Sequence, residues 1–360
     1  MQQKLAQKHP KQTKLFEQSI KSEYTKKVYL ICLKKYFNFP GKFLETKNSR
    51  KVEEHVISFV ISLKKQGKGF SAIHNYVSAI CKYYKMNDVY LNTNKINQYL
   101  PEFRKSKKDR PYKHEEIQVL LDIADDRFRA IILLLASTGV RIGAIPGLRL
   151  RNVEKLESEY GEIYKITVYE GFNEEYITFC TPECTVAIDN YLKMRERYGE
   201  KLHQNSFLIR EQFDIRDQFA ISKCNEVRGD TLTRKLIGLS ERAGIRQKEV
   251  LQEGKIRSTI RKDIPIAHGF RKFFSSQLVE ADLKTELRWL LEGHNLKGND
   301  SHYIRTTEKR LQEEYEKAIN HLTINEENRL QRTIETLKVD KSRIDMLEAK
   351  IQKLERKHRR

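Results

Sequence analysis

A short basic segment divides this chain into two parts whose hydrophobic patterns differ, and this division constrains the fold most strongly. Residues 104–111 read RKSKKDRP, which is five lysines and arginines, no large apolar side chain and a proline at the end. This composition is typical of a linker. The chain has 360 residues, and at about 100–200 residues per domain that leaves room for two domains. We therefore expect a linker over residues 104–112, with one domain on each side.

The part before the linker shows the apolar periodicity of helices. Residues 1–20 are polar, and we expect them to be flexible. A first helix is predicted to begin at Thr25 as its N-cap, because apolar side chains recur at helical spacing after it. A second helix is predicted around residues 52–63, and a third is predicted to be capped by Ser71. Short connections between them make residues 21–103 a small helical bundle.

The part after the linker, residues 113–322, mixes helical and strand patterns. Residues 128–137 (FRAIILLLAS) are nearly all apolar, which predicts a buried helix. Apolar and polar residues alternate over 162–169 and 175–180, and glycine and asparagine lie between the two runs. That pattern predicts a β-hairpin. Residues 201–262 are charged and carry no clear period, so the sequence assigns them no element.

The tail, residues 323–360, carries a seven-residue repeat of apolar residues. The repeat consists of Leu330, Leu337, Ile344 and Ile351. The intermediate core position of the repeat is apolar only towards the end, at Leu347 and Leu354. Two interpretations are equally open: a weak coiled coil, or a single amphipathic helix that lies on its own domain.

Net charge is the most informative bulk property. Lysine and arginine total 69 and aspartate and glutamate total 49, which gives a formal charge of +20. The sequence pI is about 9.5. Such a charge fits a polyanionic partner, because neutralising phosphates supplies most non-specific affinity for nucleic acid. A ribosome binder or a membrane-surface binder is the alternative from charge alone.

Several other classes of protein are disfavoured. No run of about 18 apolar residues is present, so we expect no membrane-spanning helix. The N-terminus lacks the apolar stretch of a secretory signal. The five cysteines are scattered, which favours reduced thiols in the cytoplasm. Cys180 and Cys184 lie four apart without a second Cys or His pair nearby, so no metal site is expected.

Two clusters of residues could bind a phosphate. Arg141 follows the apolar segment and a glycine turn in TGVRIG, where a guanidinium can offer planar, bidentate donors. His268 and Arg271 in HGFR are three apart, which places them on one face of a helix. Alternatively, Arg141 is simply ion-paired to a carboxylate, and the HGFR residues form an exposed polar face.

Two further residues gain meaning only from their context. His294 follows Gly293, and such a histidine often only closes a helix. Tyr303 is one of 17 tyrosines, most of which must be structural. Considered singly, neither residue points to a chemistry.

The order and spacing of these residues along the chain are more informative than any one of them. Arginine, His-x-x-Arg, Gly-His and tyrosine follow one another, and Tyr303 comes nine residues after His294. This order resembles the active-site pattern of the tyrosine recombinase (lambda-type integrase) family, and the resemblance covers most of the chain. Within the family, the stretches TGVRIGAI, HGFRKFF and LTINEENRL are most similar to integrases of archaeal viruses and mobile elements.

The resemblance implies a fold and a function. The fold would be mainly α with a small β-hairpin or sheet. It would pair a helical core-binding domain, which contacts DNA, with a mixed α/β catalytic domain. The function would be that of a site-specific DNA recombinase that integrates or excises a mobile element.

The resemblance also implies a role for each candidate residue. Tyr303 would attack a DNA phosphodiester and form a 3′-phosphotyrosyl intermediate. Arg141 and Arg271 would clamp the non-bridging oxygens and stabilise the charge of the transition state. His268 would assist proton transfer from the tyrosine, and His294 would donate a hydrogen bond to the phosphate. With arginines in this role we expect no metal and no other cofactor.

The expected partner is double-stranded DNA at attachment sites, and the expected assembly is a homotetramer on DNA. In that assembly the heptad tail would contact another protomer. We expect a cytoplasmic, nucleoid-associated protein with no membrane partner.

Two departures from the family pattern keep alternatives open. The family often places a carboxylate three residues after the first arginine, but this chain has Ala144 there. The family also places a lysine general acid in the β-hairpin, but the hairpin turn here has none, and Lys165 on the first strand is the nearest. These departures support a catalytically silent DNA-binding protein of the same fold. A type IB topoisomerase-like enzyme is the other alternative.

Overall fold

The computed structural model describes residues 10–40, 48–103, 109–246, 263–294 and 307–358. The chain forms two compact units, Met1–Ser106 and Lys107–Arg360. Each unit has a hydrophobic core of its own. The expectation of a mainly helical fold with a small sheet is confirmed.

The first unit is a helical bundle. Its described helices are α2 (Pro10–Gln18), α3 (Glu23–Phe37), α4 (Ser49–Lys65), α5 (Phe70–Lys85) and α6 (Thr93–Asn97). In α4, the apolar side chains at helical spacing between Val52 and Leu63 are buried, as the periodicity predicts. Helix α5 packs against both α3 and α4.

Three details of this unit differ from the sequence-based expectations. Ser22 caps α3 in place of Thr25, whose backbone N–H donates to the Ser22 hydroxyl. Helix α5 begins after Gly69, so Ser71 already lies inside the helix. The sequence predicts a flexible segment over residues 1–20, but residues 10–18 of that segment form α2. Phe16 of this helix is fully buried and anchors it to the core.

The second unit contains most of the described helices. They are α7 (His114–Asp122), α8 (Asp126–Thr138), α9 (Pro182–Arg197), α10 (Gln218–Ser222), α11 (Gly229–Arg242), α12 (Ile266–Glu280), α13 (Thr285–Leu291), α15 (Glu308–Leu322) and α16 (Glu326–His358). Two short 3₁₀ helices, η1 (Ile145–Gly147) and η2 (Leu150–Asn152), follow α8. The linker expected over residues 104–112 is shorter at its C-terminal end, because Tyr112 is buried in the core of this unit.

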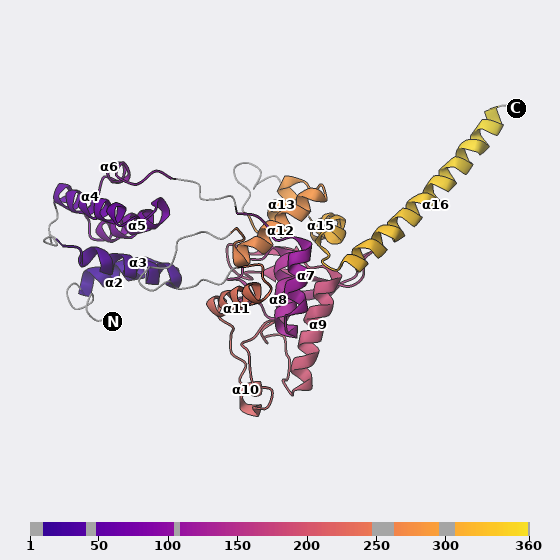
Figure 1. The fold of residues 1–360 in the computed structure, drawn as a ribbon, viewed down its shortest axis with the longest axis horizontal. Coiled ribbons are helices and arrows are strands. Elements are labelled where there is room, and N and C mark those ends of the chain that lie inside the picture. Colours follow the sequence, from indigo (N-terminus) through magenta and orange to yellow (C-terminus); the bar gives the residue numbers. More distant parts are fainter. Residues whose placement is uncertain (1–9, 41–47, 104–108, 247–262, 295–306, 359–360) are drawn as a thin grey trace. The chain divides into compact units, whose positions relative to one another are not determined.

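Helix α8 lies at the centre of the second unit. It carries the nearly all-apolar segment, and the prediction that this helix is buried is confirmed. It packs against α9 on one side and α12 on another, and α12 in turn packs against α11 and α15 (Figure 1). An apolar helix can be stable in water only when neighbours cover it on all sides.

A three-stranded antiparallel sheet completes the second unit. Its strands are β1 (Val153–Leu156), β2 (Ile163–Val168) and β3 (Tyr176–Phe179), in the order β1-β2-β3. The β2–β3 pair is the predicted hairpin, with Val168 opposite Tyr176. Strand β1 was not predicted. Its four residues are half-buried or exposed, a pattern too weak to recognise in a sequence.

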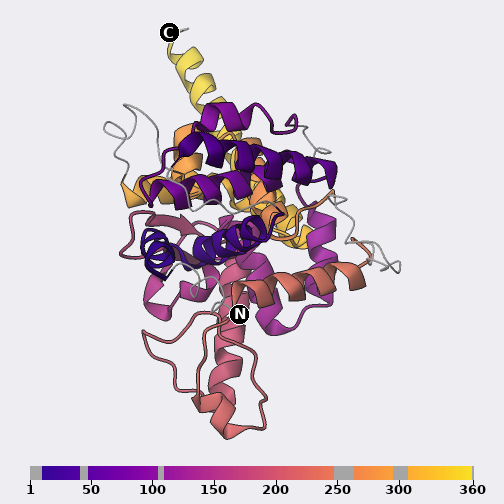
Figure 2. The ribbon, with the colours of Figure 1, turned by 90° about the vertical axis from the view of Figure 1, so that its left-hand side faces the viewer.

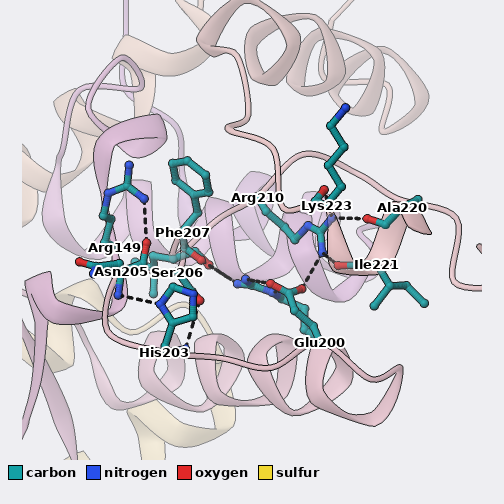
Figure 3. A network of polar contacts seen from close by, with 12 residues as sticks. Arg149, Glu200, His203, Asn205, Ser206, Phe207, Arg210, Ala220, Ile221 and Lys223 are labelled. Atoms are coloured by element: carbon teal, nitrogen blue, oxygen red, sulfur yellow. Dashed lines mark hydrogen bonds and ion pairs between the residues drawn. The ribbon is translucent and has the colours of Figure 1, made fainter. Parts of the chain in front are cut away.

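The region left unassigned by the sequence contains a buried ion network. Glu200 accepts hydrogen bonds from Arg195 and Arg210, and all three side chains are at most 5% exposed. Arg210 also donates to the carbonyl oxygens of Ala220 and Ile221 (Figure 3). The network therefore ties the loop that carries α10 to the C-terminal end of α9, where two views show them side by side (Figure 1, Figure 2).

The tail is one continuous helix, α16 (Figure 1). Its start is tied to α9 by Glu183, which accepts from the backbone N–H groups of Ile324 and Asn325. The apolar repeat from Leu330 to Ile351 is exposed. The alternative in which this stripe lies on its own domain is therefore wrong. None of the described helices is both long enough and apolar enough to cross a membrane.

Candidate active site

Arg141 follows a tight turn at the end of α8. Gly139 closes the helix in the left-handed conformation, with φ of 60°. A side chain at this position would collide with the ring of Phe274 on α12. Only glycine therefore lets the chain turn this close to α12 and present Arg141 directly after the buried helix. The Arg141 side chain is exposed.

His268 and Arg271 lie on the first turns of α12, and Arg271 is only 6% exposed. The phenylalanines of the same helix are buried, as expected for residues that anchor it to the core. His268 lies at the exposed surface of the same helix. Burial and the nearby cations Lys272, Arg271 and Arg141 together lower the pKa of His268. The two arginines and this histidine are thus close enough to repel one another.

Arg271 joins two turns that are far apart in the sequence. Its Nη1 donates to the carbonyl oxygen of Gly139 at 2.8 Å, and its Nη2 donates to the carbonyl oxygen of Glu292. Nη2 also lies 3.1 Å from Nε2 of His294. Burial lowers the pKa of Arg271, and the positive charge of Arg141 lowers it further. The guanidinium is therefore fixed by neutral carbonyl groups, and the nearby carboxylate of Glu292 offsets only part of the effect of burial on its pKa.

His294 is positioned by the residues just before it. Gly293 adopts φ of 63°, and a side chain there would collide with the ring of Tyr176. The Nδ1 atom of His294 lies 3.2 Å from Oε2 of Glu292, a carboxylate that is 4% exposed. Burial lowers the pKa of His294, and Glu292 opposes that shift. The carboxylate thus fixes one ring nitrogen and leaves the other directed at Arg271.

Glu292 and Tyr176 are site residues that the sequence reasoning missed. Tyr176 begins β3 and packs against Gly293, and burial raises its pKa while Arg271 and Arg141 oppose the rise. Glu292 is one of 49 acidic residues, and only its place before Gly-His could have suggested a role. Neither residue stands out without the fold, because each acts on a neighbour that the fold brings to it.

Arg141 and His294 open into one hollow of about 1020 Å³. Its other lining residues are Tyr169, Phe172, Glu174, Trp289 and Gly293. The hairpin turn between β2 and β3 and the end of α13 therefore form its walls. Its lining combines the guanidinium of Arg141 and the His294 ring with aromatic rings and one carboxylate, that of Glu174.

Two candidate residues do not belong to this described cluster. Tyr303 lies outside the described residues, since the chain is described up to 294 and again from 307. Lys165 is opposite Glu154 in the β1–β2 pair and forms ion pairs with Glu154 at 2.6 Å and Glu308 at 3.0 Å. The hydrogen bonds that Lys165 donates to Glu154 and to Glu308 raise the pKa of Lys165, and the bond to Glu154 has the larger effect.

The cluster has the chemistry of an anion site. Within the described part of the chain, neither Arg141 nor Arg271 forms a salt bridge with a carboxylate. The carboxylate partner that was the alternative for Arg141 is therefore not found among the residues that the structure describes. Burying a guanidinium without a counter-charge is costly, so an anion from outside would be bound favourably here. Planar donors on two arginines match the oxygens of a phosphate.

Comparison with solved structures identifies the architecture. One match is a lambda integrase dimer bound to a core site, with 13% identity and a TM-score of 0.53, covering 82% of this chain and 76% of that chain. Another is the Tn1549 transposon integrase in complex with circular intermediate DNA, with 14% identity and a TM-score of 0.53, covering 85% of this chain and 98% of that chain. The fold is that of the tyrosine recombinases.

At these identities the likeness to tyrosine recombinases concerns the fold alone. No protein-family model and no curated protein matches the sequence. The covered share, 85% of this chain, is larger than either unit, so the likeness extends into both. The expected closeness to archaeal integrases stays a prediction.

Proposed function

We propose that this protein is a site-specific DNA recombinase that cleaves and rejoins DNA through Tyr303. One observation carries the proposal: Arg141, Arg271 and two histidines gather in a tyrosine recombinase fold, with no carboxylate partner described for either arginine. A phosphodiester supplies the missing negative charge. The formal charge of +20 provides the long-range attraction to DNA.

The proposed reaction has two steps that mirror each other. The Tyr303 oxygen attacks the phosphorus, the bond to the 5′-oxygen breaks, and a 3′-phosphotyrosyl link forms. The tyrosine proton passes to His268, and the leaving 5′-oxygen gains a proton. A 5′-hydroxyl of another strand then reverses these steps. Because the phosphotyrosyl link keeps the energy of the broken bond, rejoining requires no external energy source.

The positions of the residues support distinct roles. Arg271 is immobilised by two carbonyl oxygens and can hold a non-bridging oxygen in a fixed place. Arg141 is exposed and can close on the phosphate from the solvent side. His294 faces the hollow and can donate to a phosphate oxygen when its Nε2 carries a proton. Glu292 is a positioning residue that acts through His294.

The leaving 5′-oxygen needs a proton donor, and Lys165 is the lysine nearest to the hairpin turn. Lys165 is engaged by two carboxylates and is not among the described residues that line the hollow. Both features disfavour it as the proton donor. Losing a general acid costs roughly 10²–10⁴ in rate, so slow cleavage would be the expected consequence if no other group replaces it.

The biological role we propose is integration or excision of a mobile element of archaeal type, carried out by a homotetramer on DNA. The partner is double-stranded DNA at attachment sites. The two structural neighbours are integrases in complex with DNA, which supports this assignment by analogy.

Covalent trapping tests the proposal. The substrate is a nicked duplex carrying the attachment site, taken from the direct repeats that flank the coding sequence in its genome. Wild-type protein should form a DNA adduct that survives denaturation, and Tyr303→Phe should form none. Tyr198→Phe, at the end of α9, is the matched control and should behave as wild type.

Each other outcome points to a different protein. An adduct that persists in Tyr303→Phe removes this tyrosine as the nucleophile. DNA binding without any wild-type adduct supports the catalytically silent alternative. Relaxation of supercoiled DNA without an attachment site supports the topoisomerase-like alternative.

A further inference from the structure

Helix α16 exposes a row of large apolar side chains that its own unit does not cover. Leu337 is 62% exposed, Ile344 is 54% exposed and Ile351 is 55% exposed. Residues seven apart lie on one side of a helix, so these side chains form a continuous stripe. A contiguous apolar row that is exposed to solvent often marks an interaction surface.

The described contacts that join this helix to the rest of its unit lie at its base. Arg332 donates to the Thr323 hydroxyl at 2.6 Å, and Arg329 donates to the carbonyl oxygens of Thr323 and Ile324. From Leu330 onward the apolar residues of the stripe that are described are all exposed. The base thus fixes where the helix starts, and the stripe is left for another partner.

The charges beside the stripe indicate which partner. Arg343 and Lys350 immediately precede the repeat residues Ile344 and Ile351, and Glu348 lies on the opposite flank. In a parallel, in-register pair of identical helices, the residue just before a repeat position on one helix lies next to the partner's flank. It faces the partner residue whose number is five higher than its own. Arg343 therefore faces Glu348 of a second copy.

An antiparallel pair would place these charges differently. The flanks that meet would then be identical, so basic residues would face basic residues and acidic would face acidic. Like charges across such a seam are repulsive, and the pattern selects against this orientation. The charge pattern thus favours one partner and one direction.

We propose that α16 pairs with α16 of a second copy of this chain as a parallel, in-register coiled coil. The paired segment runs from about Leu337 to the end of the helix, where the intermediate core position is also apolar, as at Leu347. Aspartate and threonine occupy that position in the earlier heptads, at 340 and 333. These polar positions keep the pairing weak, so it joins protomers only when they are concentrated together.

This inference does not depend on DNA cleavage, and its test uses the full-length protein without DNA. Leu337→Cys and Ile351→Cys are prepared as separate proteins and oxidised. A parallel pair in register brings each new thiol to its own counterpart, so each protein should form a disulfide-linked dimer. Ser342→Cys places the thiol on the opposite side of the helix and should cross-link no more than wild type.

The direction of pairing decides the result. If dimers form only when Leu337→Cys and Ile351→Cys proteins are mixed, the helices are antiparallel and the proposal is wrong. If neither protein cross-links above the wild-type level at any concentration, α16 does not pair with itself and binds something else.

Charge reversal provides a second, independent test. Arg343→Glu alone and Glu348→Arg alone should each weaken dimerisation about tenfold by sedimentation equilibrium, because attraction becomes repulsion at two symmetric contacts. The double variant restores opposite charges across the parallel seam and should recover the wild-type constant. Failure of the double variant to recover would overturn the parallel register, since both single changes are exposed and need not alter folding.

Discussion

At the scale of single residues, the site shows which inferences a sequence permits. The order of residue types along the sequence was enough to single out four of them, Arg141, His268, Arg271 and His294. Glu292 could not be singled out, because its role comes from a contact with His294 that depends on the left-handed turn at Gly293. A sequence displays the donors that bind a substrate more readily than the groups that position those donors.

Replacing Glu292 tests its positioning role. In Glu292→Gln the carboxylate that supports a positive charge on His294 is lost, so the pKa of His294 should fall further below its ordinary value. As pH rises, the variant should therefore lose protonated His294, and the cleavage that depends on it, at a lower pH than wild type. Losing a charge-assisted hydrogen bond predicts a cleavage rate reduced on the order of tenfold.

The measurement is an NMR titration of the His294 ring, identified by its absence in His294→Gln. Glu280→Gln, at the exposed end of α12, is the control and should leave the titration unchanged. An unchanged or raised pKa in Glu292→Gln would show that the carboxylate does not act on this ring.

At the scale of elements, helices and strands with strong hydrophobic periodicity could be predicted from the sequence. Segments held in place by tertiary polar contacts could not. Helix α8 and the β2–β3 hairpin follow directly from their hydrophobic patterns. The region around α10 does not, because buried charges hold it in place. Charged residues in a sequence predict an exposed segment, and only the fold shows that Arg195 and Arg210 share Glu200 in the interior.

Neutralising Glu200 should destabilise the second unit strongly. Glu200→Gln leaves two buried guanidinium groups without a counter-charge, and breaking such a pair costs about 3–5 kcal/mol. Urea unfolding at neutral pH should show this loss. Glu196→Gln, exposed in the last turn of α9, is the matched control and should change the free energy of unfolding little.

The stability that Glu200 contributes should decrease at low pH. Burial alone would raise the pKa of Glu200, but hydrogen bonds from Arg195 and Arg210 outweigh it and lower the pKa below the ordinary value of 4.5. The stability that the carboxylate contributes is therefore complete above pH 4.5 and is lost as pH falls through the lowered pKa. The difference between wild type and Glu200→Gln should narrow below pH 4.5, and a constant difference would contradict this account.

At the scale of the whole molecule, the proposed function requires that two separately folded units both contact one DNA molecule. Each unit has its own core, and the basic segment at 104–108 connects them outside the described residues. Its basic residues suit contact with a DNA backbone, and we predict such a contact, with a solvated linker that makes none as the alternative. Arg110, at the end of the segment, is bound to Glu116 at 2.6 Å, so its role is structural.

The salt dependence of DNA binding separates these roles. Each lysine that neutralises a phosphate adds about 0.9 to the slope of log affinity against log salt. Replacing Lys105, Lys107 and Lys108 with glutamine should therefore reduce the slope by about three, measured by fluorescence anisotropy on a duplex. Arg110→Gln is the control, since it should lower the stability of the second unit and leave the slope nearly unchanged. If the triple variant keeps the wild-type slope, the segment is a solvated linker that does not contact phosphates. The phosphate contacts then belong to the two folded units.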